Sequence, residues 1–430
     1  MYDEQALENF KQTVVLPWHH AALLKMEQDY RRLREQWAAH FIEHFRRFCH
    51  RILDGQRSGD KGEIGYITYS LLRTGLMDGQ PAYVAEAFDE RWFFDRQPVQ
   101  MEYDPKWAFQ PLKGLEKQWE PAARMYVGKI PMPLLEKLKL AETVHFHSYV
   151  TELIRYAMPQ AVQLPEFQDL AKSPVFELRV GEYMDHSVTV YKEDKRELDS
   201  TVVREWLGDR LEGEYAYQGV EGADLSGGDY PGLDFRYTAF RQCNLSFARL
   251  SFGMLVGTHW RNCLLEGADF SFSALHGSDF RGCRLPNSVF TGIRGGGPTE
   301  EAGVEWIMPG FGGMCFAEAD VSGADFRYAD LRGADFRAAD LRGANLREAD
   351  LREADFSEGN LFNADFTGAN LRDTNFIGAD LREANFTGSD LREVDFTGAK
   401  LTGAVLEGAD LAGAMLPEGP WSTLLKEVGR

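Results

Sequence analysis

A five-residue repeat fills most of the second half of the sequence and excludes ordinary helices and strands there. Residues 329–356 read ADLRGADFRAADLRGANLREADLREADF. A helix needs apolar residues about every 3.6 positions and a half-buried strand about every 2.0, so neither element explains a period of five. The repeat therefore predicts a chain that turns a corner every five residues around a thin core.

The large apolar residue of each repeat marks how regular the pattern is. It recurs at intervals of five from Leu225 to Phe290, breaks, and resumes one residue out of step from Phe316 to Leu416. The residue two positions earlier is small, most often alanine. A second period, of twenty residues, appears in two columns of like residues: Cys243, Cys263 and Cys283, and Phe336, Phe356, Phe376 and Phe396.

Twenty residues with a corner after every five make a coil with four sides. Successive coils then stack like parallel strands, about 4.8 Å apart, and each coil buries the core of its neighbour. Some nine coils give a rod roughly 40 Å long at that spacing. Cys243, Cys263 and Cys283 occupy the small inward position, which indicates filler of the core and not a metal-binding ladder of thiols.

The words A(D/N)(L/F)xx over about residues 221–418 resemble the pentapeptide-repeat family. The resemblance implies a right-handed quadrilateral β-helix. In gyrase-targeting members of that family the rod is similar to duplex DNA in width and charge and occupies the DNA-binding saddle of a topoisomerase. It therefore implies DNA gyrase or topoisomerase IV as a partner, and a role in resistance to an antibiotic or a toxin. Residues 1–210 resemble no family.

Negative charge is concentrated towards the end of the repeats. The chain has a formal net charge of −20, and Glu353 to Leu416 holds twelve acidic and four basic residues, net −8. This balance argues against direct binding to nucleic acid and permits attraction to a basic protein surface. The candidate contact residues are Glu353, Glu383, Glu393, Asp395 and Asp410.

Four arginines recur every twenty residues at an outward position of the coils and form a column. An aspartate or asparagine lies two residues before each of them. One interpretation is a solvated face whose ion pairs contribute little to stability. The alternative is a ladder that binds carboxylates or phosphates. The column consists of Arg332, Arg352, Arg372 and Arg392.

Two further segments could contact partners. Glycine clusters flank an apolar tip, Trp306, Ile307 and Met308, in the break at residues 291–315, which predicts an excursion with flexible hinges. This excursion either contacts a partner or covers an exposed coil edge. Both ends of a β-helix need covers, and residues 419–430 predict a short helix that caps the rod or joins two copies of the chain. Its apolar side consists of Trp421, Leu424, Leu425 and Val428.

Residues 1–210 lack the five-residue period and predict a mainly helical domain with a few short strands near its end. Apolar residues at intervals of three and four from His20 to Leu53 indicate one long amphipathic helix. Further helices are expected at residues 66–77 and 81–94, and a helical pair at 133–158. Short strands are expected at 175–184 and 186–194.

One motif in this domain suggests a metal site. His40, Glu43 and His44 match the H-x-x-E-H pattern of a zinc peptidase class, in which the histidines bind the metal and the glutamate acts as base. No third ligand is identifiable, although His145 and His147 could complete a site in principle. We favour a structural role for the motif. Because no other catalytic signature is found, we expect no cofactor, no metal and no enzymatic activity.

The sequence as a whole favours a non-catalytic interaction protein. Its most specific version is a DNA mimic that binds a topoisomerase. The alternatives are a general scaffold or adaptor and, least favoured, a metal-dependent hydrolase in the helical domain. Five cysteines without paired spacing and an acidic, poorly apolar N-terminal segment indicate a reduced, cytoplasmic protein.

Overall fold

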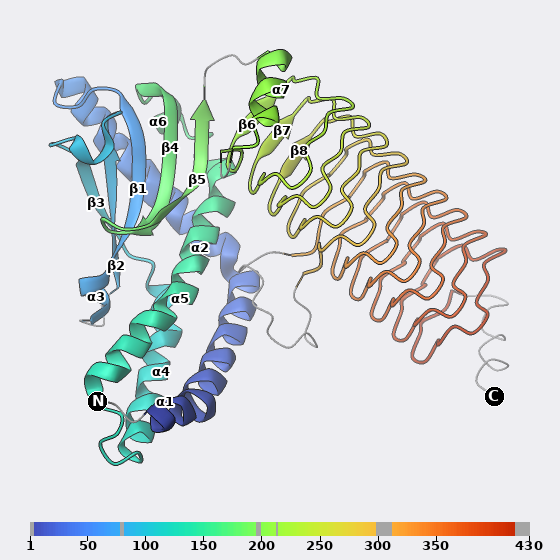
Figure 1. The fold of residues 1–430 in the computed structure, drawn as a ribbon, viewed down its shortest axis with the longest axis horizontal. Helices are drawn as coiled ribbons and strands as arrows, with labels where there is room; N and C mark the ends of the chain where they lie inside the picture. Colours follow the sequence, from blue (N-terminus) through green and yellow to red (C-terminus); the bar gives the residue numbers. More distant parts are fainter. Residues whose placement is uncertain (1–3, 78–80, 195–198, 212–213, 298–311, 418–430) are drawn as a thin grey trace. The chain divides into compact units, whose positions relative to one another are not determined.

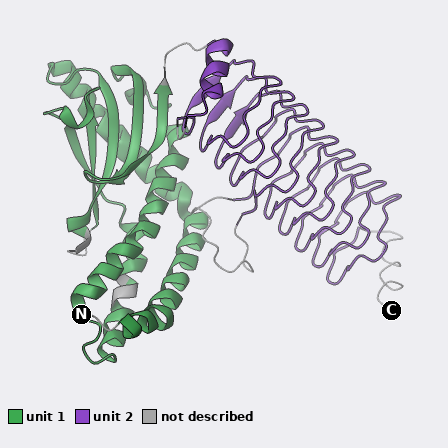
Figure 2. Ribbon diagram, in the orientation of Figure 1, with its two compact units in different colours: residues 1–196, 308–310 green, residues 197–307, 311–430 purple. Residues whose placement is uncertain are grey.

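The chain divides into two compact units, residues 1–196 with 308–310 and residues 197–307 with 311–430 (Figure 2). The computed structural model describes residues 4–77, 81–194, 199–211, 214–297 and 312–417. No helix within these ranges combines the length and the apolar character needed to cross a bilayer.

Unit 1 contains a five-stranded sheet with the strand order β3-β2-β1-β4-β5. The central strand β1 pairs in parallel with β4, and every other pairing is antiparallel. Nearly every side chain of β1 is buried, as expected for the middle of a covered sheet. The strands are β1 (Ile64–Leu72), β2 (Ala82–Phe88), β3 (Val99–Tyr103), β4 (Lys172–Glu182) and β5 (Ser187–Asp194).

Long helices accompany this sheet (Figure 1). The C-terminal half of α2 packs on it, since the rings of Phe41 and Tyr69 lie 5.3 Å apart. The N-terminal half packs on α4 and α5, where the ring of Tyr30 lies 6.4 Å from that of Trp107 and 5.5 Å from that of Tyr149. The helices of unit 1 are α1 (Glu4–Phe10), η1 (Lys11–Val15), α2 (Leu16–Ser58), α3 (Arg73–Met77), η2 (Trp92–Phe94), α4 (Lys106–Arg124), α5 (Met132–Ala161) and α6 (Pro165–Gln168).

Several predicted elements of unit 1 are confirmed and others are wrong. The long helix is α2, and the two short strands are β4 and β5. The helices predicted at residues 66–77 and 81–94 are mainly the strands β1 and β2. Their apolar runs have almost no polar face, so periodicity could not separate helix from strand, and the tyrosine, isoleucine and threonine content of β1 favoured a strand. The predicted helical pair at 133–158 is the single helix α5.

Unit 2 is a stack of coils joined by parallel bridges (Figure 1). Bridges connect residues twenty apart, from Asp224 with Asn244 to Asp395 with Met415, at four positions in each coil. This spacing is the same as that of the twenty-residue coil predicted from the sequence. Three bridge positions extend into short parallel strands, β6 (Gly219–Glu221), β7 (Ala239–Arg241) and β8 (His259–Arg261).

The core of the stack is built from the columns seen in the sequence. The rings of Phe336 and Phe376 lie 4.7 and 5.0 Å from that of Phe356, which they sandwich almost in parallel. Cys243, Cys263 and Cys283 are 1% exposed. Each thiol donates to a backbone carbonyl of the preceding coil, and burial raises the pKa of Cys283 to about 11.

Each corner explains why the repeat prefers aspartate or asparagine before the large apolar residue. Oδ1 of Asp335 accepts a hydrogen bond from the backbone N–H of Arg337, 3.1 Å away. This Asx turn fixes the start of the corner. The next residue, Ala338, has a φ of 54°, and equivalent positions hold glycine or another residue at positive φ.

The first coil is covered by α7 (Ser200–Gly208), which precedes it. Val203 and Leu207 are buried in the same apolar core as the coils. Arg204 donates to the backbone carbonyls of Asp224 and Ser226, 2.8 and 3.1 Å away. These bonds satisfy backbone groups that would otherwise form an open edge.

The break in the repeat is an insertion between two coils. Asp279 bridges to Cys315, a separation of 36 residues where 20 is the rule, so sixteen residues are inserted. Sixteen is three repeats plus one, which explains why the pattern resumes one residue out of step. After the insertion, the chain passes very close to the backbone of another coil. A Cβ on Gly313 would lie 2.4 Å from the backbone of Gly333. This glycine therefore provides close packing, where the sequence suggested a flexible hinge.

Candidate functional site

Acidic side chains gather at the corners of the later coils. Glu353, Asp373 and Glu393 lie twenty residues apart, in one column, with φ values of 60°, 58° and 58°. All three side chains are exposed. Glu383 occupies the same kind of corner in another column, with a φ of 60°. The corner geometry thus places these carboxylates outside the backbone of the stack.

Two of these carboxylates extend along the stack, over the next coil. A Cβ on Gly403 would lie 2.2 Å from Oε1 of Glu383, and one on Gly413 would lie 2.3 Å from Oε1 of Glu393. Within the described residues, neither carboxylate takes part in an ion pair. Because the next coil has glycine at these two positions, the carboxylates of Glu383 and Glu393 have room to lie over it, along the stack.

Most arginines on the coils are paired with an aspartate of their own repeat. Arg337 lies 2.7 Å from Asp335, and Arg342 lies 2.6 Å from Asp340. In the arginine column predicted from the sequence, Arg332, Arg352 and Arg392 make the same pairs with Asp330, Asp350 and Asp390. The guanidinium of Arg392 hydrogen-bonds Asp390 and lowers the pKa of that carboxyl, so the pair stays ionised. The charge of these arginines is thus balanced locally, whereas Glu353 to Leu416 carries a net charge of −8.

The remaining candidates from the sequence have different surroundings. Asp395 is half-buried and accepts a hydrogen bond from the backbone of Thr397, so it belongs to a corner. Asp410 is exposed and lies 3.7 Å from Arg392. The predicted loop tip and C-terminal helix lie outside the described residues: Trp306, Ile307, Met308, Trp421, Leu424, Leu425 and Val428.

The H-x-x-E-H motif on α2 does not have the geometry of a metal site. His44 is buried, and its ring nitrogens lie 2.9 Å from the carbonyl of Glu102 and 3.3 Å from the hydroxyl of Tyr69. Burial lowers the pKa of His44 to about 4. His40 is exposed, and Glu43 pairs with Arg46. Both nitrogens of His44 therefore have protein partners, which favours a structural role.

A different cluster joins α2 to α5. Nδ1 of His19 lies 3.1 Å from Oε2 of Glu142, and Nε2 of His145 lies 3.8 Å from the same oxygen. One ligand atom from each residue lies within 4.8 Å of the others. The sequence analysis named His145 as a possible ligand but missed His19 and Glu142, although the spacing Glu-x-x-His on one helix was a usable signal. His147, which lies two residues after His145 on α5, forms a hydrogen bond with Tyr83.

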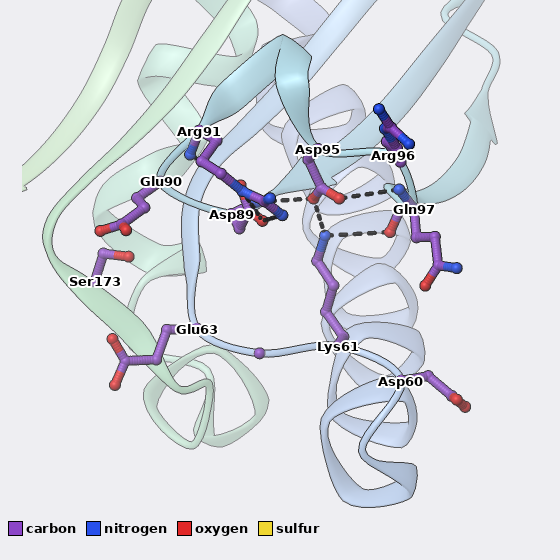
Figure 3. Close-up of a pocket in the computed structure, with 11 residues that line it drawn as sticks. Asp60, Lys61, Glu63, Asp89, Glu90, Arg91, Asp95, Arg96, Gln97 and Ser173 are labelled. Atoms are coloured by element: carbon purple, nitrogen blue, oxygen red, sulfur yellow. Dashed lines mark hydrogen bonds and ion pairs between the residues drawn. The ribbon is translucent and has the colours of Figure 1, made fainter.

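A cleft of about 480 Å³ in unit 1 is lined by residues that follow α2 and β2 (Figure 3). Its floor holds a buried ion pair between Lys61 and Asp95. Asp95 also accepts hydrogen bonds from the backbone of Asp89 and Gln97, 2.9 and 3.0 Å away. Lys61 donates to the carbonyl of Gln97 as well. The protein itself satisfies the charges of Lys61 and Asp95, so neither of these two groups is left for a ligand.

Comparison with known sequences identifies the repeats. Residues 243–282 and 319–418 match the family described as pentapeptide repeats, in eight copies. No curated protein matches the chain.

Two solved structures with similarity to the chain match about half of it. One is HetL of the cyanobacterium Nostoc sp. strain PCC 7120, involved in heterocyst differentiation regulation. It is 24% identical, and the match covers 52% of this chain and 99% of HetL, with a TM-score of 0.29. Another is QnrB1, a plasmid-mediated fluoroquinolone resistance protein. It is 22% identical, with coverage of 50% and 98% and a TM-score of 0.29. At these scores neither structure indicates what this chain binds.

Proposed function

The C-terminal region of this chain belongs to the pentapeptide-repeat family, and on this basis we propose that the protein is a non-catalytic interaction protein. Its repeat unit docks against a basic protein surface through the coils from residue 353 onward. The right-handed, four-sided geometry of the coils is part of this proposal. So is a cytoplasmic location, in which the five cysteines remain as free thiols.

The observation that carries the proposal is the uneven distribution of charge on an otherwise uniform scaffold. From Val321 to Arg352, six acidic residues face six arginines, whereas Glu353 to Leu416 has a net charge of −8. The excess includes corner carboxylates that are exposed and, for Glu383 and Glu393, without an ion pair among the described residues. A rigid acidic surface attracts basic partners and speeds their association.

The partner class that fits this surface best is a protein with a DNA-binding cleft. Such clefts present lysine and arginine to a duplex with one negative charge per about 1.7 Å of axis. A narrow acidic rod can occupy the same cleft. We therefore propose a type II topoisomerase, DNA gyrase or topoisomerase IV, as the partner, with protection against an antibiotic or a toxin as the outcome. Pairing of two copies through residues 419–430 remains a prediction.

A supercoiling assay with DNA gyrase tests this proposal. The whole protein at micromolar concentration and low salt should inhibit the enzyme or protect it from a quinolone. The double variant E383Q/E393Q should lose most of this effect. Its matched control is E318Q/E348Q, which removes two exposed corner glutamates from the coils before residue 353.

The outcomes of the assay separate the alternatives. If gyrase is unaffected with and without the drug, the topoisomerase proposal fails and a general scaffold or adaptor takes its place. If both double variants lose the effect equally, binding does not depend on the coils beyond residue 353. Asp395 is left unchanged in this design because it accepts a backbone hydrogen bond.

A further inference from the structure

The cluster on α2 and α5 has the composition of a divalent metal site. His19 lies near the start of α2, and Glu142 and His145 lie one turn apart on α5. Two imidazoles and one carboxylate form a donor set that zinc accepts, with a fourth position left for water. All three residues belong to unit 1, and none belongs to the H-x-x-E-H motif.

Two distances within the cluster are close to those that a metal would impose, and all three ligand atoms lie within 4.8 Å of one another. Tetrahedral zinc with bonds of about 2.0–2.1 Å places neighbouring ligand atoms about 3.3 Å apart. The observed separations from Oε2 of Glu142 are 3.1 Å to His19 and 3.8 Å to His145. The side chain of His145 is 37% exposed and has room to close on the other two. The three groups thus already converge on one point.

A buried ring nitrogen supplies a second indication. The side chain of His19 is 4% exposed. Its Nδ1 lies within ion-pair distance of Glu142 but makes no hydrogen bond to any described residue. A buried nitrogen without a hydrogen bond is unusual, because desolvation is costly unless a partner compensates for it. A metal ion between Nδ1 and the carboxylate would provide that partner.

The cluster is accessible to an ion from solvent. The side chain of His145 is 37% exposed, whereas that of His19 is 4% exposed. Glu142 is 17% exposed, so one side of the cluster remains open to solvent and to an entering ion.

We propose that His19, Glu142 and His145 bind one zinc ion, which links the N-terminal part of α2 to α5. The three ligands come from segments more than 120 residues apart in sequence, so the metal would cross-link two long helices. This proposal is independent of the interaction surface on unit 2. It differs from the expectation of no metal, which was based on the H-x-x-E-H motif and on the lack of other signatures in the sequence.

Zinc titration of the whole chain tests the site. After chelation and dialysis, the wild-type protein should bind one equivalent of zinc, and zinc should raise the thermal midpoint of the helical signal. The isosteric variant E142Q should bind zinc more than about 100-fold more weakly, since loss of even an outer-shell partner costs 10- to 100-fold. The matched control H40A removes an exposed histidine from the same helix and should bind zinc like the wild type.

A second variant keeps the test decisive if E142Q does not fold. H145Q changes the most exposed of the three ligands and should also lose zinc binding. The proposal is overturned if the wild type binds no zinc at micromolar concentration, if H145Q binds as tightly as the wild type, or if H40A loses the ion. Either of the first two results would make the cluster a polar contact between helices.

Discussion

At the scale of single residues, each position of the repeat has a separate physical task. The large apolar residue fills the core, and Phe356 is 0% exposed between two parallel rings. The aspartate or asparagine before it holds the corner, and the residue two positions after it occupies positive φ outside the stack. Only the outward positions are therefore available for recognition.

The first prediction separates inward from outward positions. Phe356→Arg should unfold several coils and lower the free energy of unfolding by several kcal/mol, because it buries a charge in a dry column. Arg352→Ala removes a partly exposed ion pair and should cost about 1 kcal/mol or less. Thermal melts of unit 2 compare the two. Equal midpoints would contradict the assignment of the positions.

The second prediction concerns pH. Burial lowers the pKa of His44 to about 4, below its usual value of 6.5. The unfolded state therefore binds the proton more readily, so the stability of unit 1 should be highest above pH 6.5 and should fall as pH drops towards 4.

The variant H44Q tests the origin of this decline. It should be less stable than the wild type at pH 7 but should lose less of its stability on acidification. The thermal midpoint of the helical circular dichroism signal, measured at a series of pH values from 7 down to 4, reports this loss of stability. H40A is the control. If H44Q and the wild type decline with the same slope, His44 does not cause the pH dependence.

At the scale of elements, the sequence predicted best where a single period dominated. The coils follow from spacing alone, and α2 follows from its apolar stripe. The strands β1 and β2 were missed because burial on both faces removes the alternation that identifies a strand. The cap of Arg204 over backbone carbonyls was missed because its partners lie 20 and 22 residues away.

The third prediction concerns the insertion between coils. Gly313→Ala should destabilise unit 2 by about 1–3 kcal/mol, because a Cβ there would lie 2.4 Å from the backbone of Gly333. Gly312→Ala is the matched control, since a Cβ at that position meets nothing within 4 Å. Chemical denaturation of the two variants measures the difference. Similar losses in both would show that the close approach does not require glycine.

At the scale of the whole molecule, the chain combines two units built on different principles. The repeat unit was predictable because each coil repeats the contacts of its neighbour. Unit 1 depends on contacts between distant segments, such as β1 with β4 and His19 with Glu142, and no local pattern encodes them. The candidate acidic residues could be named from the sequence. The structure adds which of them are exposed and which, like Asp395, serve the corner.

The affinity of the protein for DNA gyrase, measured at low and at moderate salt, tests the central claim most directly. We expect tight binding at low salt that weakens at least about tenfold as salt rises, because screening acts on exposed charges. E383Q/E393Q should bind several-fold more weakly at low salt, and E318Q/E348Q should match the wild type. Binding that is insensitive to salt, or that weakens equally in both double variants, would contradict docking through the acidic coils.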